Sequence, residues 1–323
     1  MDPRPLNVLA VSNLWPEAGG FRGVFVREQV EALRRLGHRV DVEVVNQTRG
    51  RSDYLLAARR VRRRARSGGY DVVHVHYGLS ALASRFVGLP RVLSLYGSDV
   101  NNRRQFVLTR LGWGGCAARI YVSKRLATTA GDPAPVVIAN GVDFATFTPG
   151  DREAARAVLG ITPDERVVLF GALPGNPVKG YEVYTAVLAA LRQRGLPVRE
   201  LILSAPGQPM STVVAKLDAA DVLLFTSRQG SEGSPTVVKE AAAMGLPVVT
   251  VDVGDVAETL DGVAPSAVVP FEPDLVSALA DRTAEVLAAG TRSNGRERTG
   301  WLDSAAVAQR VVDVYRRVVA ASS

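Results

Sequence analysis

The most constraining feature of this sequence is a series of short, apolar, β-branched runs that alternate with helical stretches from end to end. Six runs lie in the first half and five in the second. They read NVLAVS, RVDVEVV, DVVHVH, RVLSLY, RIYVS and PVVIA, then RVVLFG, ELILSA, DVLLFTS, PVVTVD and AVVPF. Continuous apolar strands separated by helices indicate parallel sheets that are covered on both faces. The sequence therefore predicts an α/β chain of two doubly wound domains.

The length and the turn signals predict where the two domains divide. A chain of 323 residues exceeds what one hydrophobic core usually fills, so we expect two domains of about 150 residues. Asn140-Gly141 and Pro149-Gly150 are turn signals, and DREAARAVL then has the pattern of a new helix. We therefore expect domains over 1–147 and 148–303. The stretch 304–320 follows as a final helix with a core-facing stripe of Val307, Val311, Val314, Tyr315 and Val318.

Composition excludes several classes of protein. With 47% hydrophobic and 22% charged residues, disorder is not expected. No stretch reaches the roughly 18 apolar residues of a membrane span, and the first apolar run is too short for a signal peptide. The single cysteine, Cys116, rules out an internal disulfide framework and is expected to be a small buried residue. These features indicate a cytoplasmic protein.

A net charge of +7 favours acidic partners, and much of the excess lies in ARRVRRRARS, residues 58–67. Two interpretations stay open for this helix. It is either a solvated helix or a basic patch that contacts a membrane surface or steers an acceptor, through Arg59–Arg66. Nucleic-acid binding is not expected, because no recognition module is present and aromatic residues make up only 6%.

The stretch SEGSPTVVKEAAAMGLPVVT, residues 231–250, carries the strongest functional pattern. Ser234 is a good N-cap and Pro235 suits the first helical position, so free N–H groups there could hold a phosphate. Glu232 precedes the helix, whereas Glu240 lies about one and a half turns inside it, some 7 Å along the axis. A nucleoside diphosphate sugar has this layout, with the diphosphate between two sets of hydroxyls. Carboxylates are good acceptors for both sets.

Two glycine-containing loops after strands could also hold a phosphate. Lys179 precedes Gly180 at a helix start, where a cation opposes the helix dipole unless an anion neutralises both. The alternative is an exposed lysine that points into water. Gly19 and Gly20 precede another helix and either let a phosphate approach the backbone or form a simple flexible loop.

Polar side chains follow two strands of the first half. Period two places His74 and His76 on one face, where they line a ligand site more readily than they bind a metal. Tyr96 and Asp99 end the next strand. Asp99 either orients a hydroxyl or caps the following NNRRQF helix.

These residues together resemble the retaining glycosyltransferases of family 4, which have the GT-B fold of two Rossmann-like domains. The resemblance covers nearly the whole chain and rests on the Glu-x7-Glu block. The other matching stretches are the Gly-Gly loop, YGSD at 96–99, VIANGVDFATFTP at 137–149, the Lys-Gly pair and GDVAE at 254–258. NPVKG with EGSP and KEA is most similar to the teichuronic-acid type of bacterial polysaccharide glycosyltransferase.

The resemblance implies a cleft between the domains, a final helix that returns to the first domain, and roles for particular residues. Lys179 would contact the diphosphate, Glu232 the donor-sugar hydroxyls and Glu240 the ribose. Backbone groups of Gly233, Ser234, Pro235 and Thr236 would join Lys179, and Gly19-Gly20 would approach the phosphate or acceptor. His76, Tyr96 and Asp99 would lie on the acceptor side.

Two positions depart from the family pattern. Tyr96 stands where the family often has histidine. Only Lys179 is present where the family commonly has an arginine as well, so Arg22 or Arg228 would have to supply the second cation.

The resulting hypothesis is a bacterial, metal-independent, retaining glycosyltransferase without a cofactor. It would move a sugar from a nucleotide diphosphate sugar to an acceptor sugar, a lipid-linked glycan or a small metabolite. Lys179, Glu232 and a helix N-terminus would serve the reaction. The alternatives are a nucleotide-sugar epimerase on the same fold and a non-catalytic binding protein.

Overall fold

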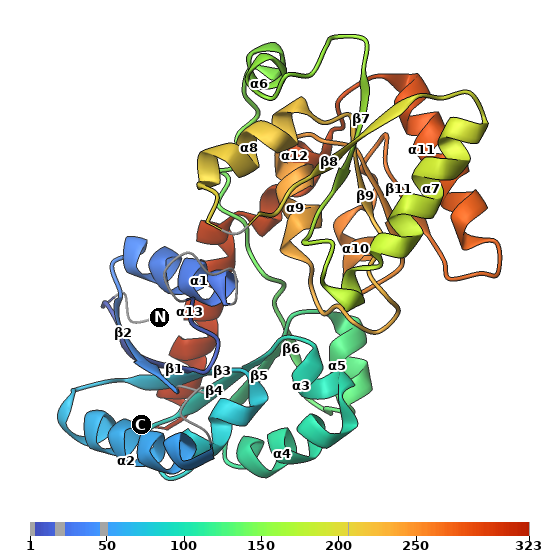
Figure 1. Cartoon of the computed structure of the whole chain (residues 1–323). Coiled ribbons are helices and arrows are strands. Elements are labelled where there is room, and N and C mark those ends of the chain that lie inside the picture. The colour runs from blue at the N-terminus through green and yellow to red at the C-terminus, as the bar shows by residue number, and fades with distance from the viewer. Residues whose placement is uncertain (1–3, 17–22, 46–50, 206, 323) are drawn as a thin grey trace. The chain divides into compact units, whose positions relative to one another are not determined.

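Two compact units make up the chain in a computed structural model, which describes residues 4–16, 23–45, 51–205 and 207–322 (Figure 1). One unit comprises Met1–Gly141 with Ser304–Ser323, and the other Val142–Asp303. Each contains one sheet whose strands are all parallel, and each of the eleven apolar runs overlaps a strand. The predicted fold class of two doubly wound α/β domains is confirmed.

The sheet of the first unit has the strand order β2-β1-β3-β4-β5-β6. Its strands are β1 (Asn7–Ser12), β2 (Arg39–Val44), β3 (Val72–His76), β4 (Arg91–Leu95), β5 (Ala118–Tyr121) and β6 (Val136–Val137). The central strands β3 and β4 are buried at every residue, as expected for a parallel sheet covered on both faces.

Helices cover the two faces of this sheet. One layer holds α2 (Arg51–Ser67), η2 (Gly78–Ser84), α3 (Ser98–Asn101), α4 (Arg103–Trp113) and α5 (Lys124–Ala130). On the other face α1 (Val24–Arg35) packs against α13 (Ser304–Ala320). The predicted stripe of α13 is confirmed, because all five of its residues are buried in this second layer.

A buried histidine also ties α13 to the first sheet. The His74 Nδ1 atom lies 2.5 Å from the Tyr315 hydroxyl of α13, and its Nε2 atom lies 2.8 Å from the Ser94 hydroxyl of β4. Both ring nitrogens of this fully buried imidazole therefore have partners, which removes the cost of burying them. The last helix of the chain is thereby anchored in the first unit by polar as well as apolar contacts.

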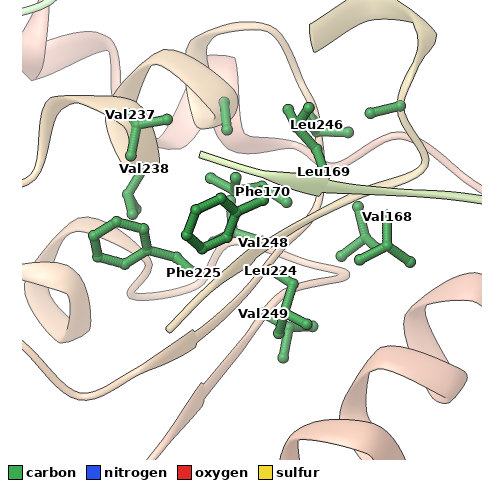
Figure 2. Packing of buried hydrophobic residues seen from close by; sticks show 14 of the residues in the cluster. Val168, Leu169, Phe170, Leu224, Phe225, Val237, Val238, Leu246, Val248 and Val249 are labelled. Atoms are coloured by element: carbon green, nitrogen blue, oxygen red, sulfur yellow. The ribbon is translucent and has the colours of Figure 1, made fainter. Parts of the chain in front are cut away.

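The second unit contains a sheet of order β11-β10-β9-β7-β8. Its strands are β7 (Arg166–Phe170), β8 (Val198–Ile202), β9 (Val222–Phe225), β10 (Val248–Val251) and β11 (Ala267–Val269). The helices are α6 (Arg152–Val158), η3 (Pro177–Lys179), α7 (Tyr181–Gln193), α8 (Met210–Ala219), α9 (Thr236–Ala243), α10 (Val256–Thr259), α11 (Leu275–Ala289), α12 (Gly295–Arg298) and η4 (Gly300–Leu302). Figure 2 shows Val237 and Val238 of α9 beside Phe170 and Phe225, the last residues of β7 and β9.

The chain passes between the units at Gly141 and again at Asp303. Just after the first passage, the Val142 N–H donates to the Leu302 carbonyl at 2.9 Å. Phe144 and Phe147 then pack into the core of the second unit. Residues 142–147 therefore pack with the second unit, whereas the sequence boundary was drawn after residue 147.

Local sequence signals account for several helix starts. Asp151 caps α6 by accepting from the Ala154 N–H at 3.0 Å, so the helix expected from DREAARAVL is confirmed. Cys116 is buried, as expected. None of the helices that the structure describes is long and apolar enough to cross a membrane.

Candidate functional site

The candidate site in the second unit lies where β7 and β9 end. The chain enters this sheet at β7, adds β8 on one side and then β9, β10 and β11 on the other. The winding direction therefore reverses between β7 and β9, and open parallel sheets bind ligands at such a point. The loop after β7 carries Lys179, and the loop after β9 carries Glu232.

The structure brings these two predicted residues together. The Lys179 Nζ atom lies 2.6 Å from Glu232 Oε1, and the Ser227 hydroxyl donates to the same oxygen at 2.7 Å. The Lys179 side chain is 25% exposed and the Glu232 side chain 12% exposed. Neither of these bonds uses Oε2. The pair is thus partly desolvated, which strengthens its electrostatics, yet a ligand can still reach it.

Backbone contacts between the two loops hold Lys179 in place. Gly180 has φ of 65°, and a Cβ atom there would lie only 2.0 Å from the Thr226 carbonyl oxygen. The Thr226 hydroxyl donates to the Gly180 carbonyl at 2.9 Å. Only glycine permits both this left-handed conformation and this close approach. The Lys-Gly pair therefore has a structural explanation for its second member.

Arg228, a candidate for the second cation at the diphosphate, pairs with a surface carboxylate. Its guanidinium lies 2.8 Å from Glu182 in the first turn of α7, and both side chains are exposed. Its backbone N–H donates to the Val178 carbonyl at 2.9 Å and so links the two loops once more. The side chain of Arg228 therefore has an acidic partner outside the Lys179–Glu232 pair.

The start of α9 differs from the prediction. The helix begins at Thr236 with Pro235 as its N-cap residue, one position later than expected. The Ser234 hydroxyl donates to Asp255 Oδ2 at 2.8 Å and accepts a hydrogen bond from the Lys239 ammonium. The N-cap prediction for Ser234 is wrong because a buried ion pair binds its side chain instead.

That ion pair is a feature that the sequence analysis missed. The Lys239 Nζ atom lies 2.8 Å from Asp255 Oδ2, with the two side chains 1% and 3% exposed. The pair joins α9 to the loop after β10. The sequence does contain one indication of this pair. Lys239 lies between Val238 and Ala242, which are both buried, and a lysine on the buried side of a helix requires a buried partner.

The remaining residues of the Glu-x7-Glu block lie on or next to α9. Gly233 is buried, and a Cβ atom added at Gly254 would lie 2.8 Å from its carbonyl oxygen. Thr236 begins the helix, where first-turn N–H groups have no partner within the helix. Glu240 is the fifth residue of α9 and is half-buried, so it lies about 6 Å along the axis from Thr236 at 1.5 Å per residue.

The histidines of the first unit lie as period two predicts. The rings of His74 and His76 share one face of β3, with centroids 4.0 Å apart. The His76 Nδ1 atom lies 2.7 Å from the Tyr96 hydroxyl, whereas its Nε2 atom has no hydrogen-bond partner among the described residues. Burial lowers the pKa of His76 to about 3, so its imidazole is neutral at physiological pH.

Asp99 organises the loops around this histidine. Its carboxylate accepts the backbone N–H groups of Gly97 at 2.8 Å, Tyr96 at 3.0 Å and Gly78 at 3.2 Å, and it is fully buried. Burial raises the pKa of Asp99 to about 6, against the lowering effect of these donors. Asn102, rather than Asp99, caps α4 over the NNRRQF segment. Asp99 is therefore not the cap of α4; its carboxylate holds the loops that contain Gly78, Tyr96 and Gly97.

Tyr77, which the sequence analysis did not single out, has an unusual backbone conformation beside these residues. Its φ of 76° is rare for a residue with a side chain and costs roughly 1–3 kcal/mol. The Tyr77 hydroxyl bonds the Ser98 hydroxyl at 2.8 Å and also donates to Gln105. No local sequence signal marks this conformation, because bonds from distant elements hold it.

Some predicted positions lie outside the described residues, namely Gly19, Gly20 and Arg22. Within the part of the chain that the structure describes, no group of three or more histidine, cysteine, aspartate or glutamate side chains could hold a metal ion.

Comparisons with known proteins agree with this architecture. Residues 206–289 match the family described as "Glycosyl transferases group 1", and residues 23–146 match "Glycosyltransferase Family 4". The D-inositol 3-phosphate glycosyltransferase of Saccharomonospora viridis is 30% identical over 314 residues, covering 79% of this chain and 72% of that protein. The putative teichuronic acid biosynthesis glycosyltransferase TuaC of Bacillus subtilis is 27% identical over 217 residues, covering 58% and 54%.

Some relatives are longer than this chain. The D-inositol 3-phosphate glycosyltransferase of Actinosynnema mirum is 31% identical over 279 residues, which cover 76% of this chain and 65% of that protein. For the Mycolicibacterium gilvum enzyme of the same name the identity is 34% over 277 residues, with shares of 71% and 61%. The chain thus spans less than two thirds of the length of these two relatives.

Solved structures share the fold. Sucrose-phosphate synthase from Thermosynechococcus elongatus superposes with a TM-score of 0.80 at 18% identity, covering 98% of this chain and 100% of that one. Anabaena HepE in complex with UDP gives a TM-score of 0.71 at 17% identity, covering 97% and 100%. At these identities the likeness establishes the fold alone.

The buried pair generates a stability prediction. We expect Lys239→Met to lower the free energy of unfolding by about 3–5 kcal/mol, because Asp255 is left as an uncompensated buried charge. The double variant Lys239→Met/Asp255→Asn should recover at least half of that loss. Urea unfolding followed by circular dichroism measures both, with Arg194→Met, which breaks an exposed pair with Asp281, as the matched control. A loss no larger than that of the control would contradict this account.

Asp99 generates a pH prediction. Between the ordinary pKa of 3.8 and about 6, the folded protein holds a proton that the unfolded chain releases. The contribution of Asp99 to stability is therefore greatest below pH 4 and is lost as the pH rises to 6. Relative to Asp99→Asn, the wild type should lose roughly 2 kcal/mol between pH 4 and pH 7. Urea titrations at both pH values test this. A constant difference would mean that folding does not raise the pKa of Asp99.

Proposed function

This chain belongs to the group 1, family 4 glycosyltransferases with the two-domain GT-B fold, and on that premise we propose that it transfers a sugar from a nucleoside diphosphate donor to an acceptor hydroxyl. The observation that carries this proposal is the Lys179–Glu232 pair, which joins the loops after β7 and β9 at 2.6 Å beside the start of α9. The second unit would bind the donor, and the first unit would carry the acceptor side.

The charges at this point suit a nucleoside diphosphate sugar. The ammonium of Lys179 and the first-turn N–H groups of α9 are donors for the diphosphate. On binding, Lys179 would exchange the Glu232 carboxylate for a phosphate oxygen. Glu232 would then accept from hydroxyls of the donor sugar, and Glu240, further along α9, from those of the ribose. Gly233, Ser234 and Pro235 would shape the backbone around the diphosphate.

We propose a retaining reaction that needs no metal or cofactor. The bond between the anomeric carbon and the phosphate oxygen breaks, and the acceptor oxygen forms its bond on the same face of the sugar. The departing phosphate oxygen takes the acceptor proton. Lys179 and the helix N-terminus stabilise the negative charge that develops on the diphosphate, a contribution of a few kcal/mol per donor group. Transfer in the presence of a chelator tests the metal independence directly.

The acceptor is the least constrained part of the proposal. Several relatives are named D-inositol 3-phosphate glycosyltransferases, so hydroxylated small metabolites join lipid-linked glycans as acceptor classes to assay. His76, Tyr96 and Asp99 lie at the ends of β3 and β4 in the first unit. Because His76 and Asp99 are fully buried, we infer that they position the loops that meet the acceptor, and that Tyr96 is the member of this group best able to reach it.

Donor identity can be tested by thermal stabilisation. We expect one series among UDP-, GDP-, dTDP- and ADP-linked sugars to stabilise the wild type by about 2.7 kcal/mol at one hundred times the dissociation constant. Glu240→Ala should abolish most of that shift, whereas Glu285→Ala, which removes an exposed acid of α11, should keep it. If no donor stabilises the folded wild type, the non-catalytic alternative gains at the expense of this proposal.

The leaving-group role of Lys179 can be tested by kinetics. With the donor identified above, Lys179→Ala should lower kcat/KM for release of the nucleoside diphosphate by about 10²–10³, because a charge-stabilising donor is lost. Arg282→Ala is the matched control, since it removes an exposed cation of the second unit that pairs with Glu285 on α11. A Lys179→Ala variant within about threefold of the wild type would rule out this role. Product analysis then separates transfer from epimerisation.

A further inference from the structure

The outer surface formed by α2, the segment 85–89 and α4 has an unusual combination of charge and exposed apolar groups. Both helices pack against η2 and belong to the same layer of the first unit, opposite α1 and α13 (Figure 1). We call this the α2–α4 surface. It is independent of the candidate donor site, which belongs to the second unit.

Exposed arginines cover this surface. Those of α2 are Arg59, Arg62, Arg63 and Arg66. The other two arginines of its last turns, Arg60 and Arg64, pair with Glu43 of β2 at 2.6 Å and 3.1 Å. The inner edge of α2 is therefore neutralised, whereas its outer edge keeps its charge.

The neighbouring segments add cations and no anions. Arg85 and, on α4, Arg103, Arg104 and Arg110 are exposed as well. The sequence contains no acidic residue over 56–67, over 78–98 or over 100–113. The net charge of +7 is thus unevenly distributed, and this surface carries a large part of the excess.

Large apolar side chains project from the same surface. On α4, Val107, Leu108 and Leu111 are 43% to 58% exposed, and Phe86 is 74% exposed. The inner side of α4 packs by other residues: a Cβ atom at Gly112 would lie 2.8 Å from that of Ala81 in η2. The exposed residues are therefore not needed for the packing of α4. The outer face of a helix on a water-soluble surface is normally polar.

A hollow connects the basic and apolar parts. It has a volume of about 590 Å³ and lies between α2 and the segment 85–89. Arg62 and Arg66, one helical turn apart, line it together with Phe86 and Val87. Two guanidinium groups beside an apolar wall match a phosphate that is joined to a hydrocarbon chain. The Arg85 guanidinium donates to the Leu111 carbonyl at 3.0 Å and so links the segment 85–89 to α4.

We propose that the α2–α4 surface docks the protein on an anionic lipid bilayer. The arginines would lie at the level of the lipid phosphates, with Arg62 and Arg66 holding a headgroup in the hollow. Val107, Leu108, Leu111 and Phe86 would enter the boundary between headgroups and acyl chains. Basic helices with exposed leucine and phenylalanine bind membranes in this way, by apolar burial together with attraction to anionic lipids.

The apolar residues favour a bilayer over a nucleic acid. Single-stranded nucleic acids bind by stacking their bases on aromatic rings, which valine and leucine side chains do not provide. Phosphate contacts alone would use the arginines and leave the three apolar residues of α4 in water. Burial in lipid gives both groups a role.

The test is co-sedimentation of the full chain with vesicles of phosphatidylcholine alone or with 30 mol% phosphatidylglycerol. We expect binding to the anionic vesicles only. Removing three charges by Arg62→Gln/Arg63→Gln/Arg66→Gln, or the apolar groups by Val107→Ser/Leu108→Ser/Leu111→Ser, should each weaken the partition coefficient by about tenfold or more. All substituted side chains are exposed, so folding should be kept and is checked by circular dichroism.

Matched controls remove the same groups elsewhere. Arg166→Gln/Arg194→Gln/Arg282→Gln gives the same net charge from exposed positions of the second unit, and Val158→Ser/Leu196→Ser removes exposed apolar groups there. Both controls should bind as the wild type does. Equal losses for the two arginine triples, or full binding by the serine triple, would show non-specific attraction and overturn the proposal.

A depth measurement separates insertion from surface attraction. In a background with Trp15, Trp113 and Trp301 replaced by phenylalanine, tryptophan fluorescence of Leu108→Trp should be quenched by lipids brominated on their acyl chains, whereas that of Val158→Trp should not. Absence of quenching at Leu108 would overturn the proposal. So would binding to single-stranded RNA together with no binding to anionic vesicles. None of these readouts requires catalytic activity, so a failure of the proposed transfer reaction would leave this test intact.

Discussion

The candidate donor site depends on the close approach of two loops at Gly180 and Thr226. A strand order that reverses between β7 and β9 places these loops next to each other, and the missing side chain of Gly180 lets them touch. The contact brings Lys179 within 2.6 Å of Glu232, although 53 residues separate them in the chain. Both charges are partly desolvated, so each needs the other until a ligand supplies new partners.

The fold was largely predictable from the sequence, because parallel sheets impose continuous apolar strands and helices impose a stripe. The eleven strands and the buried stripe of α13 follow from these local rules. The position at which the chain passes from the first unit to the second was harder to predict from the sequence. Residues 142–147 lie between the turn signals Asn140-Gly141 and Pro149-Gly150, and their membership of the second unit depends on the packing of Phe144 and Phe147 and on the bond from Val142 to Leu302.

The two charged residues of the candidate site could be identified from the sequence. The contacts that hold the surrounding residues in place could not. Lys179 and Glu232 could be identified because each follows a strand and precedes a helix. Ser234 could not be placed correctly, since its hydroxyl binds Asp255, which lies 21 residues further along the chain. Asp99 and Tyr77 show the same limit: backbone N–H groups and hydroxyls from other segments determine their conformations. Local propensity carries no information about such contacts.

The two lysines of the candidate site differ in burial, and this difference separates a structural lysine from one that a ligand can reach. Lys239 is 1% exposed and binds Asp255 and Ser234, whereas Lys179 is 25% exposed and binds Glu232. Exchange of an ion-pair partner requires that the new partner arrive before the old one is lost, because an unpaired buried charge is costly. A ligand can reach Lys179 from solvent, but reaching Lys239 would require opening the core around α9. Lys239 is therefore confined to holding α9 against the loop after β10, whereas Lys179 is exposed enough to exchange Glu232 for a partner from solvent.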